Sequence, residues 1–170
     1  MMRLLLAILL AVECGHSYKA RREPGLSVDD YGRATGSQDN VDFRMDAGCT
    51  NSDCSIQVDI LNLRSAPLHV APDSASLTSA CQLDGRDIVY WQGTGASNFE
   101  ELKKLARVRA ASPYWLSLPE GAILTIPPRG FVRISYPAGI ERGHRCAPYT
   151  FSLHTADGPT IAAAFTDADP

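Results

Sequence analysis

The stretch VDFRMDAGCTNSDCSIQVDIL, residues 41–61, decides the fold. Apolar residues occupy every second position of residues 41–45 and again of residues 56–60, and residues 149–153 repeat the pattern. A period of two in β-branched and aromatic residues is typical of half-buried strands. Further candidate strands are residues 68–71, 88–92, 114–118, 123–126, 131–136 and 160–166.

Turn-forming residues separate these segments. They stand at positions 84–85, 119–121, 127–130, 138–139 and 157–159. Short strands at this spacing predict an all-β fold, an immunoglobulin-like antiparallel β-sandwich of about seven to nine strands with one short helix.

The helix is expected at residues 98–107, where the alternation stops. Asn98 is a good N-cap, and the two glutamates after Phe99 fall in the first turn, where the helix dipole favours them. Lys103 and Arg107 share another face of this amphipathic helix. That face is interpreted as solvated in preference to a basic contact patch.

Composition sets the class of protein. The chain has 170 residues, 45% of them hydrophobic and 21% charged, with a net charge of −3. These values indicate a single globular domain and exclude a coiled coil, a collagen, a polytopic membrane protein and a wholly disordered chain. The weak negative charge gives no general attraction for nucleic acid or anionic membrane.

The N-terminus has the pattern of a secretory signal peptide, which we assign to residues 1–17. Arg3 precedes an apolar run at residues 4–12, far shorter than the ~20 residues that span a bilayer. A buried first strand is disfavoured by the polar stretch that starts at Glu13. Lipidation of Cys14 is disfavoured too, because Glu13 stands where a small residue is needed. The expected location is periplasmic or secreted.

The rest of the chain divides into three parts. Residues 18–40 are polar and without period, which predicts a flexible leader. The sandwich domain is assigned to residues 41–166, and residues 167–170 are a tail.

Four cysteines follow the signal peptide, an even number that suits an oxidising compartment. Of the three connectivities, we favour Cys49 with Cys54 and Cys81 with Cys146. The first bond closes a short polar loop, and the second closes a long one that contributes about 4 kcal/mol in the chain-entropy model. A zinc site is disfavoured, because no two cysteines have the spacing of a zinc knuckle.

The common catalytic motifs do not occur in the sequence. The sequence has no G-x-S-x-G elbow, P-loop, H-E-x-x-H or C-x-x-C motif. His144, Cys146 and His154 do not have the spacing of a copper site, and Met45 lies on the wrong side of them. We therefore expect no enzyme, no metal and no cofactor.

Two aromatic pairs, Tyr90-Trp91 and Tyr114-Trp115, lie in candidate strands. Neighbours in a strand point to opposite faces, so one ring of each pair should belong to the core. The other is either exposed, which suits a protein or glycan contact, or packed under the helix, which we favour.

A family resemblance rests on four segments in order. They are VDILNLRSAPL at 58–68, LDGRDIVYWQG at 83–93, YWLSLPEG at 114–121 and PYTF at 148–151. Over residues 56–153 this order resembles the non-catalytic Ig-like N-terminal domain of deuterolysin-type metallopeptidases. The zinc-binding protease domain is absent, so the resemblance implies only a stand-alone β-sandwich of binding type, with no catalytic residue.

The predicted function is an exported protein-binding module, an inhibitor or immunity-type protein that acts on a partner hydrolase by surface contact. The alternatives are an accessory domain of a secreted or envelope assembly, and an uncharacterised hydrolase. The contact is expected on the loop at 92–97 with its helix, or on the loop at 140–145, whose donors could enter an acidic cleft. The candidate binding residues are Gln92, Asn98, Arg142, His144 and Arg145. The partner is a protein, with no nucleic acid and no membrane span.

Overall fold

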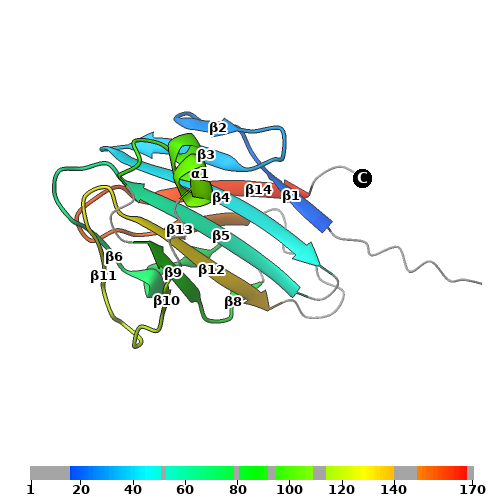
Figure 1. The fold of residues 1–170 in the computed structure, drawn as a ribbon. Helices are drawn as coiled ribbons and strands as arrows, with labels where there is room; N and C mark the ends of the chain where they lie inside the picture. Colours follow the sequence, from blue (N-terminus) through cyan, green and yellow to red (C-terminus); the bar gives the residue numbers. More distant parts are fainter. Residues whose placement is uncertain are drawn as a thin grey trace, which may run out of the picture.

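The computed structural model describes residues 16–50, 53–78, 81–91, 95–108, 114–139 and 149–167. They form an antiparallel β-sandwich with one short α-helix (Figure 1), which confirms the predicted fold class. The described strands number fourteen, more than predicted, because β2, β3 and most of β1 lie in the expected leader and β7 and β8 have only two residues each. They are β1 (His16–Ala20), β2 (Leu26–Val28), β3 (Ala34–Gln38), β4 (Val41–Thr50), β5 (Asp53–Asn62), β6 (Leu68–Val70), β7 (Ser76–Leu77), β8 (Gln82–Leu83), β9 (Asp87–Trp91), β10 (Tyr114–Leu116), β11 (Leu124–Ile126), β12 (Phe131–Gly139), β13 (Tyr149–Leu153) and β14 (Ile161–Asp167). The helices are the 3₁₀ turn η1 (Pro72–Ser74) and α1 (Phe99–Val108).

The front layer is built around the β4–β5 hairpin. Its strands follow the order β10-β9-β12-β5-β4, with β3 and then β2 beyond β4. The long strand β12 runs along β5, pairing Phe131 with Leu61 at one end and Ala138 with Cys54 at the other. The alternation of residues 41–45 and 56–60 follows from this arrangement, because one face of both strands lies on the core.

Strand β1 joins the two layers. Its first residues pair with the end of β4, Ser17 opposite Gly48, and its last three residues pair with β14. The back layer continues from β14 to β13 (Figure 1), and β7 pairs with β13 on its other side. A separate two-stranded sheet, β6 with β11, closes one end of the sandwich.

The core lies between the layers and is apolar. Its largest fully buried side chains include Met45, Ile60 and Ile134 from the front layer and Phe151 and Phe165 from the back. Burial of such side chains is the main favourable contribution to folding, about 1.5–3 kcal/mol for each.

The predicted flexible leader at residues 18–40 is wrong. This segment contains most of β1 and all of β2 and β3, and Tyr18 and Ala34 are buried. The Tyr18 ring meets the Tyr149 ring edge-on, with 5.6 Å between centroids. These short strands are held mainly by backbone pairing with β4 and β14, which leaves little apolar alternation in the sequence.

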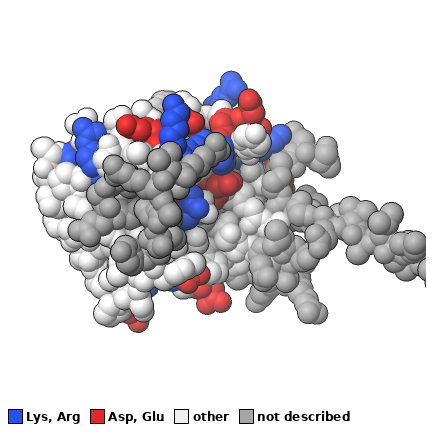
Figure 2. Space-filling model, viewed as in Figure 1, with Lys and Arg blue, Asp and Glu red and all other residues white. Residues whose placement is uncertain are grey.

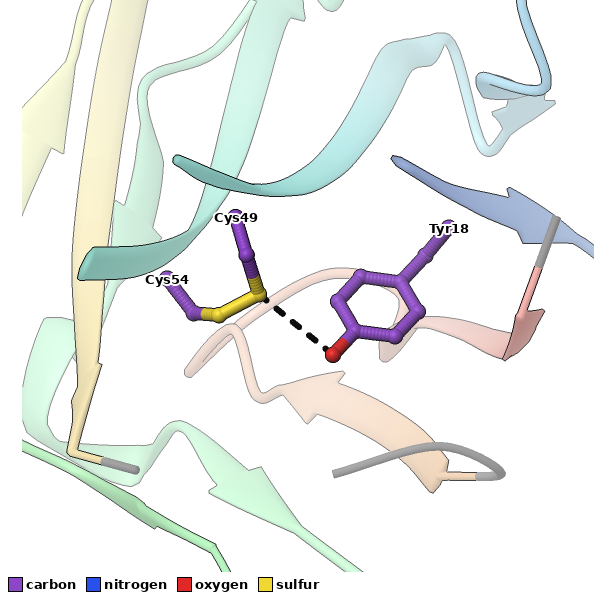
Figure 3. Close-up of a disulfide and its surroundings, with 3 residues drawn as sticks. All are labelled: Tyr18, Cys49 and Cys54. Atoms are coloured by element: carbon purple, nitrogen blue, oxygen red, sulfur yellow. Dashed lines mark hydrogen bonds between the residues drawn. A yellow bond between two sulfur atoms is a disulfide. The ribbon is translucent and has the colours of Figure 1, made fainter. Parts of the chain in front are cut away.

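The predicted disulfide between Cys49 and Cys54 is present. The two residues face each other across the β4–β5 hairpin, and the Tyr18 hydroxyl donates a hydrogen bond to Cys49 Sγ at 3.4 Å (Figure 3). Cys81 is disulfide-bonded as well. Its predicted partner, Cys146, lies outside the described residues, so that pairing stays a prediction.

Candidate binding edge

The residues predicted for binding fall mostly outside the described parts of the chain. This holds for Gln92, Arg142, His144 and Arg145. Asn98 is described, and it is the N-cap of α1: its Oδ1 accepts a hydrogen bond from the Glu101 amide at 2.8 Å. The predicted cap is therefore confirmed, whereas a contact role for Asn98 stays a prediction.

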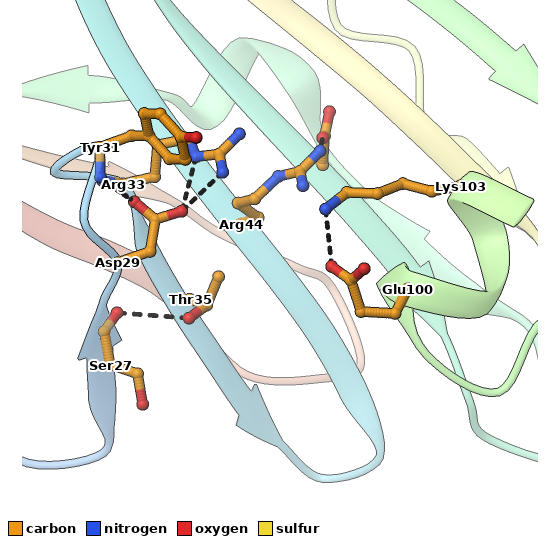
Figure 4. A network of polar contacts seen from close by, with 9 residues as sticks. Ser27, Asp29, Tyr31, Arg33, Thr35, Arg44, Glu100 and Lys103 are labelled. Carbon is orange, nitrogen blue, oxygen red and sulfur yellow. Dashed lines mark hydrogen bonds and ion pairs between the residues drawn. The ribbon is translucent and has the colours of Figure 1, made fainter.

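Helix α1 lies on the outer face of the front layer. Phe99 meets Phe131 of β12 edge-on, with 6.3 Å between ring centroids, and the Arg44 guanidinium lies 5.2 Å from the Phe99 centroid. Figure 4 shows Arg44 between the Asp29–Arg33 loop and the Glu100–Lys103 ion pair of α1. Aromatic and cation–π contacts thus hold the helix against the sheet.

Next to these contacts of the helix, Asp59 is buried between two arginines. It is 1% exposed and accepts hydrogen bonds from Arg133 Nε at 2.7 Å, Arg133 Nη2 at 3.0 Å and Arg44 Nη2 at 2.5 Å. The hydrogen bond with Asp59 is the main cause that raises the pKa of Arg133. The cluster links β4, β5 and β12 through side chains on their outer faces. Both arginines are paired with Asp59.

The row of laterally paired residues that contains this cluster continues across β9 and ends at an exposed tryptophan on β10. Arg133 lies opposite Val89 of β9, and Val89 lies opposite Trp115 of β10. Trp115 is 74% exposed, so the favoured expectation that the outer ring packs under the helix is wrong for this residue. Strand β10 pairs with β9 on one side and has no strand on its other side among the described residues.

A groove of about 270 Å³ opens next to this tryptophan. Leu116 of β10 and Ile88 of β9 form the last pair between these two strands, and the residues beyond this pair are no longer paired with each other. The groove is lined by Arg86, Asp87, Ile88, Trp115, Leu116, Ser117 and Leu118. We call strand β10 together with these residues the Trp115 edge.

The rim of the groove is held by the side chain of Arg86. Its Nη1 forms an ion pair with Asp73 Oδ1 at 2.5 Å, and its Nη2 donates to the Pro119 carbonyl at 3.0 Å. Asp73 in turn accepts a hydrogen bond from the Gly121 amide at 2.6 Å. Arg86 Nε is buried and has no hydrogen-bond partner among the described residues. The segment that follows β10 is therefore fixed to η1.

The surroundings of the Trp115 edge are acidic. Asp84, Asp87 and Glu120 are exposed and form no ion pair with any described residue, while Arg86 is neutralised by Asp73. Figure 2 shows acidic side chains along the lower edge of the molecule, where β8, β9 and β10 lie in Figure 1. These three carboxylates favour a cationic ligand at this edge.

A histidine–carboxylate pair lies at β6, away from the Trp115 edge in the sheet order. His69 Nδ1 lies 2.8 Å from Asp157 Oδ2, and Arg64 donates to the Asp157 carbonyl at 3.0 Å. Hydrogen bonds from the His69 amide, and next from its ring, hold the pKa of Asp157 below its usual value. The pair joins β6 to the turn between β13 and β14. The described residues contain no group of three or more His, Cys, Asp or Glu able to hold a metal ion.

The chain was compared with known proteins. No protein-family model matches it, and no curated protein is significantly similar to it. The resemblance to the N-terminal domain of deuterolysin-type metallopeptidases thus rests on the four segments quoted above. Within the described residues, no helix is both long and apolar enough to cross a membrane.

Reasoning from the sequence found part of this site and missed the rest. Trp115 was one of four aromatic candidates, but alternation alone does not say which ring stays outside. Arg86 and Asp73 carry no local signal, because they meet only through the packing of η1 against the segment after β10. The lack of a second neighbour for β10 is a property of the whole sheet.

Proposed function

We propose that the protein is an exported protein-binding module that recognises its partner at the Trp115 edge. The observation that carries this proposal is a tryptophan, 74% exposed, on a strand without a second neighbour among the described residues. Tryptophan is the residue type most enriched among those that dominate binding energy in protein interfaces. An open strand also offers backbone N–H and C=O groups to a partner strand.

Export is supported by two features of the chain. Residues 1–17 have the pattern of a signal peptide, and the Cys49–Cys54 disulfide suits an oxidising compartment. Cleavage after Ser17 would remove the two β1 residues that pair with β4 and leave residues 18–20 paired with β14. Periplasmic or secreted location is therefore part of the proposal. We also propose that the protein acts by binding alone, without catalysis.

The narrower prediction of a hydrolase inhibitor depends on other residues. It requires the loop that carries Arg142, His144 and Arg145 to enter an acidic cleft of the partner. That loop lies outside the described residues, so no contact in the structure bears on it. A role as an accessory domain of an envelope assembly is compatible with the same edge.

The proposal is tested by photo-cross-linking in the native envelope or culture medium. A photoreactive phenylalanine analogue replaces Trp115 in one variant and Tyr31 in a matched control, because Tyr31 is also an exposed aromatic, at 78%. We expect a protein adduct of defined mass from position 115 and none from position 31. Adducts from position 31 alone, or from neither position, would contradict the proposal.

The stability of the Trp115→Ala variant separates binding from folding. An exposed side chain outside the core is expected to change the free energy of unfolding by less than about 0.5 kcal/mol. Thermal melts of this variant and the wild type should therefore coincide, while affinity capture of the partner is lost in the variant.

A further inference from the structure

We infer that the Trp115 edge takes an extended segment of a partner protein with basic side chains at alternate positions, added to the front layer as a further strand. This inference rests on the proposed function and specifies the chemistry of the partner. It follows from three properties of the edge: the outer backbone of β10, which meets no described strand, the side chains on its outer face and those on its inner face.

The backbone sets an extended conformation. Strand β10 is the last in the order β10-β9-β12-β5-β4 of the described strands, so its outer backbone groups meet no described strand. A partner segment that pairs with them must itself be extended, with side chains alternating between the two faces.

The outer face favours cations. Trp115 lies opposite Val89, and Asp87 precedes Val89 by two positions, so Trp115 and Asp87 share the outer face. A Lys or Arg that faces Trp115 gains a cation–π contact, and one two residues further along that face is attracted by Asp87, which lies one strand beyond β10. Among the described residues, Arg86 of the groove and Arg133, opposite Val89, are already paired with Asp73 and Asp59.

The inner face favours apolar side chains. Leu116 and Leu118 are partly buried against the core, and Ile88, opposite Leu116, is almost fully buried. Side chains of an added strand that point inward would extend this apolar surface. The ligand is therefore an alternating basic and apolar segment.

Arg86 prepares the site for such a segment. Its bonds to Asp73 and the Pro119 carbonyl fix the groove rim before any ligand arrives. A rim that is already ordered reduces the entropy cost of binding.

The test uses short synthetic peptides and the folded protein. A fluorescent alternating Lys-Val peptide is compared with a Glu-Val peptide of equal length by anisotropy, and with a Lys-Pro peptide that cannot form a strand. We expect the Lys-Val peptide alone to bind, with weaker binding as salt rises. Trp115→Ala should weaken it between about twofold and thirtyfold, the range that corresponds to a cation–π contact.

Matched variants control for general effects. Asp87→Asn should also weaken Lys-Val binding, whereas Tyr31→Ala and Asp30→Asn, which alter exposed residues far from β10 in the sheet order, should leave it unchanged. Hydrogen exchange should slow at the β10 amides when the peptide is bound.

The outcomes separate this inference from the proposed function. Equal or tighter binding of the Glu-Val peptide would contradict the inference that the ligand segment is basic. Lys-Val binding that is unchanged by the substitutions at Trp115 and Asp87 would contradict it too. If the cross-link at position 115 is still found, the binding module stands with a different ligand. Sedimentation that shows dimers lost in Trp115→Ala would assign the edge to a second copy and overturn the inference. If no peptide binds and no adduct forms from position 115, both the proposed function and this inference are contradicted.

Discussion

At the residue scale, Asp59 holds the outer face of the front layer together. Two guanidinium groups converge on one carboxylate that is 1% exposed. Their positive charges are compensated by Asp59 alone within this cluster. Because a buried ion pair costs much more to break than it contributes when intact, the side chain is sensitive to change.

Asp59→Asn should lower the free energy of unfolding by about 3 kcal/mol, the lower end of the range for a broken buried pair. The lower end is chosen because Arg133 is 34% exposed and keeps some solvent screening. Urea unfolding measures the change. Asp42→Asn, a half-buried carboxylate on the same face, is the control and should change stability by less than about 0.5 kcal/mol. Equal midpoints for the two variants would show that the cluster is not needed.

Gly36 of β3 is the second sensitive residue. A Cβ at this position would overlap the ring of Phe43 and come within 2.9 Å of Leu26. Gly36→Ala should therefore destabilise the protein by about 1–3 kcal/mol, as overpacking does. Gly48→Ala on β4 is the matched control, because a Cβ there meets nothing within 4 Å. Thermal melts that rank the two variants in the opposite order would refute this account of the β3–β4 contact.

At the scale of elements, the start of α1 is sensitive to pH. Hydrogen bonds from the Ser97 hydroxyl and amide hold the pKa of Glu101 below its ordinary 4.5. A carboxylate with a lowered folded pKa stabilises the fold above its unfolded pKa and loses that contribution as pH falls through the folded value. We expect hydrogen exchange in the first turn of α1, corrected for intrinsic rates, to increase below about pH 4.5.

Glu101→Gln provides the comparison for that experiment. Glutamine does not titrate, so its first-turn exchange should have no such pH dependence. Asn98→Ala should instead speed exchange at every pH, with a loss of about 1 kcal/mol for the N-cap. Parallel pH profiles in the wild type and Glu101→Gln would exclude Glu101 as the titrating group.

The elements differ in how far the sequence predicts them. Residues 41–45 and 56–60 are predictable as strands, because one face of each strand is buried and the other is not, so apolar and polar residues alternate. β2 and β3 lie beyond β4 in the front layer and are stabilised largely by backbone pairing, so their residues carry no clear period. Continued by one residue, the alternation of residues 56–60 predicts Leu61 on the polar side of β5, yet Leu61 is fully buried on that outer face, opposite Phe131.

At the scale of the whole molecule, the second predicted disulfide is still to be determined. Cys81 is bonded, and a Cys81–Cys146 bond would close a long loop. Replacing both residues with serine should cost about 2–5 kcal/mol. Replacing Cys49 and Cys54, which close a short loop, should cost less, about 2 kcal/mol in the same model. Non-reducing peptide mapping identifies the bond, and a different partner for Cys81 would contradict the prediction.

The candidate site also belongs to this scale, which explains why the sequence predicts so little of it. Trp115 could be placed in a strand, but its exposure depends on which strands lie beside β10. The groove depends on Arg86 and Asp73 meeting across a long separation in the chain. Periodicity reports local burial, and neither of these properties is local.

The pairing of β1 with β14 determines how the sandwich responds to tension. Tyr18 faces Asp167 and Ala20 faces Phe165, so the first and last described strands run antiparallel with their outer ends together. A force applied to the two ends of the chain would load the pairs of β1 one after another, first those of His16 and Ser17 with β4 and then that of Tyr18 with Asp167. The strands would peel apart at low force, and shear across several hydrogen bonds at once would not occur. Opening would begin where β1 meets β14, and the Cys49–Cys54 disulfide would keep β4 and β5 joined at their hairpin.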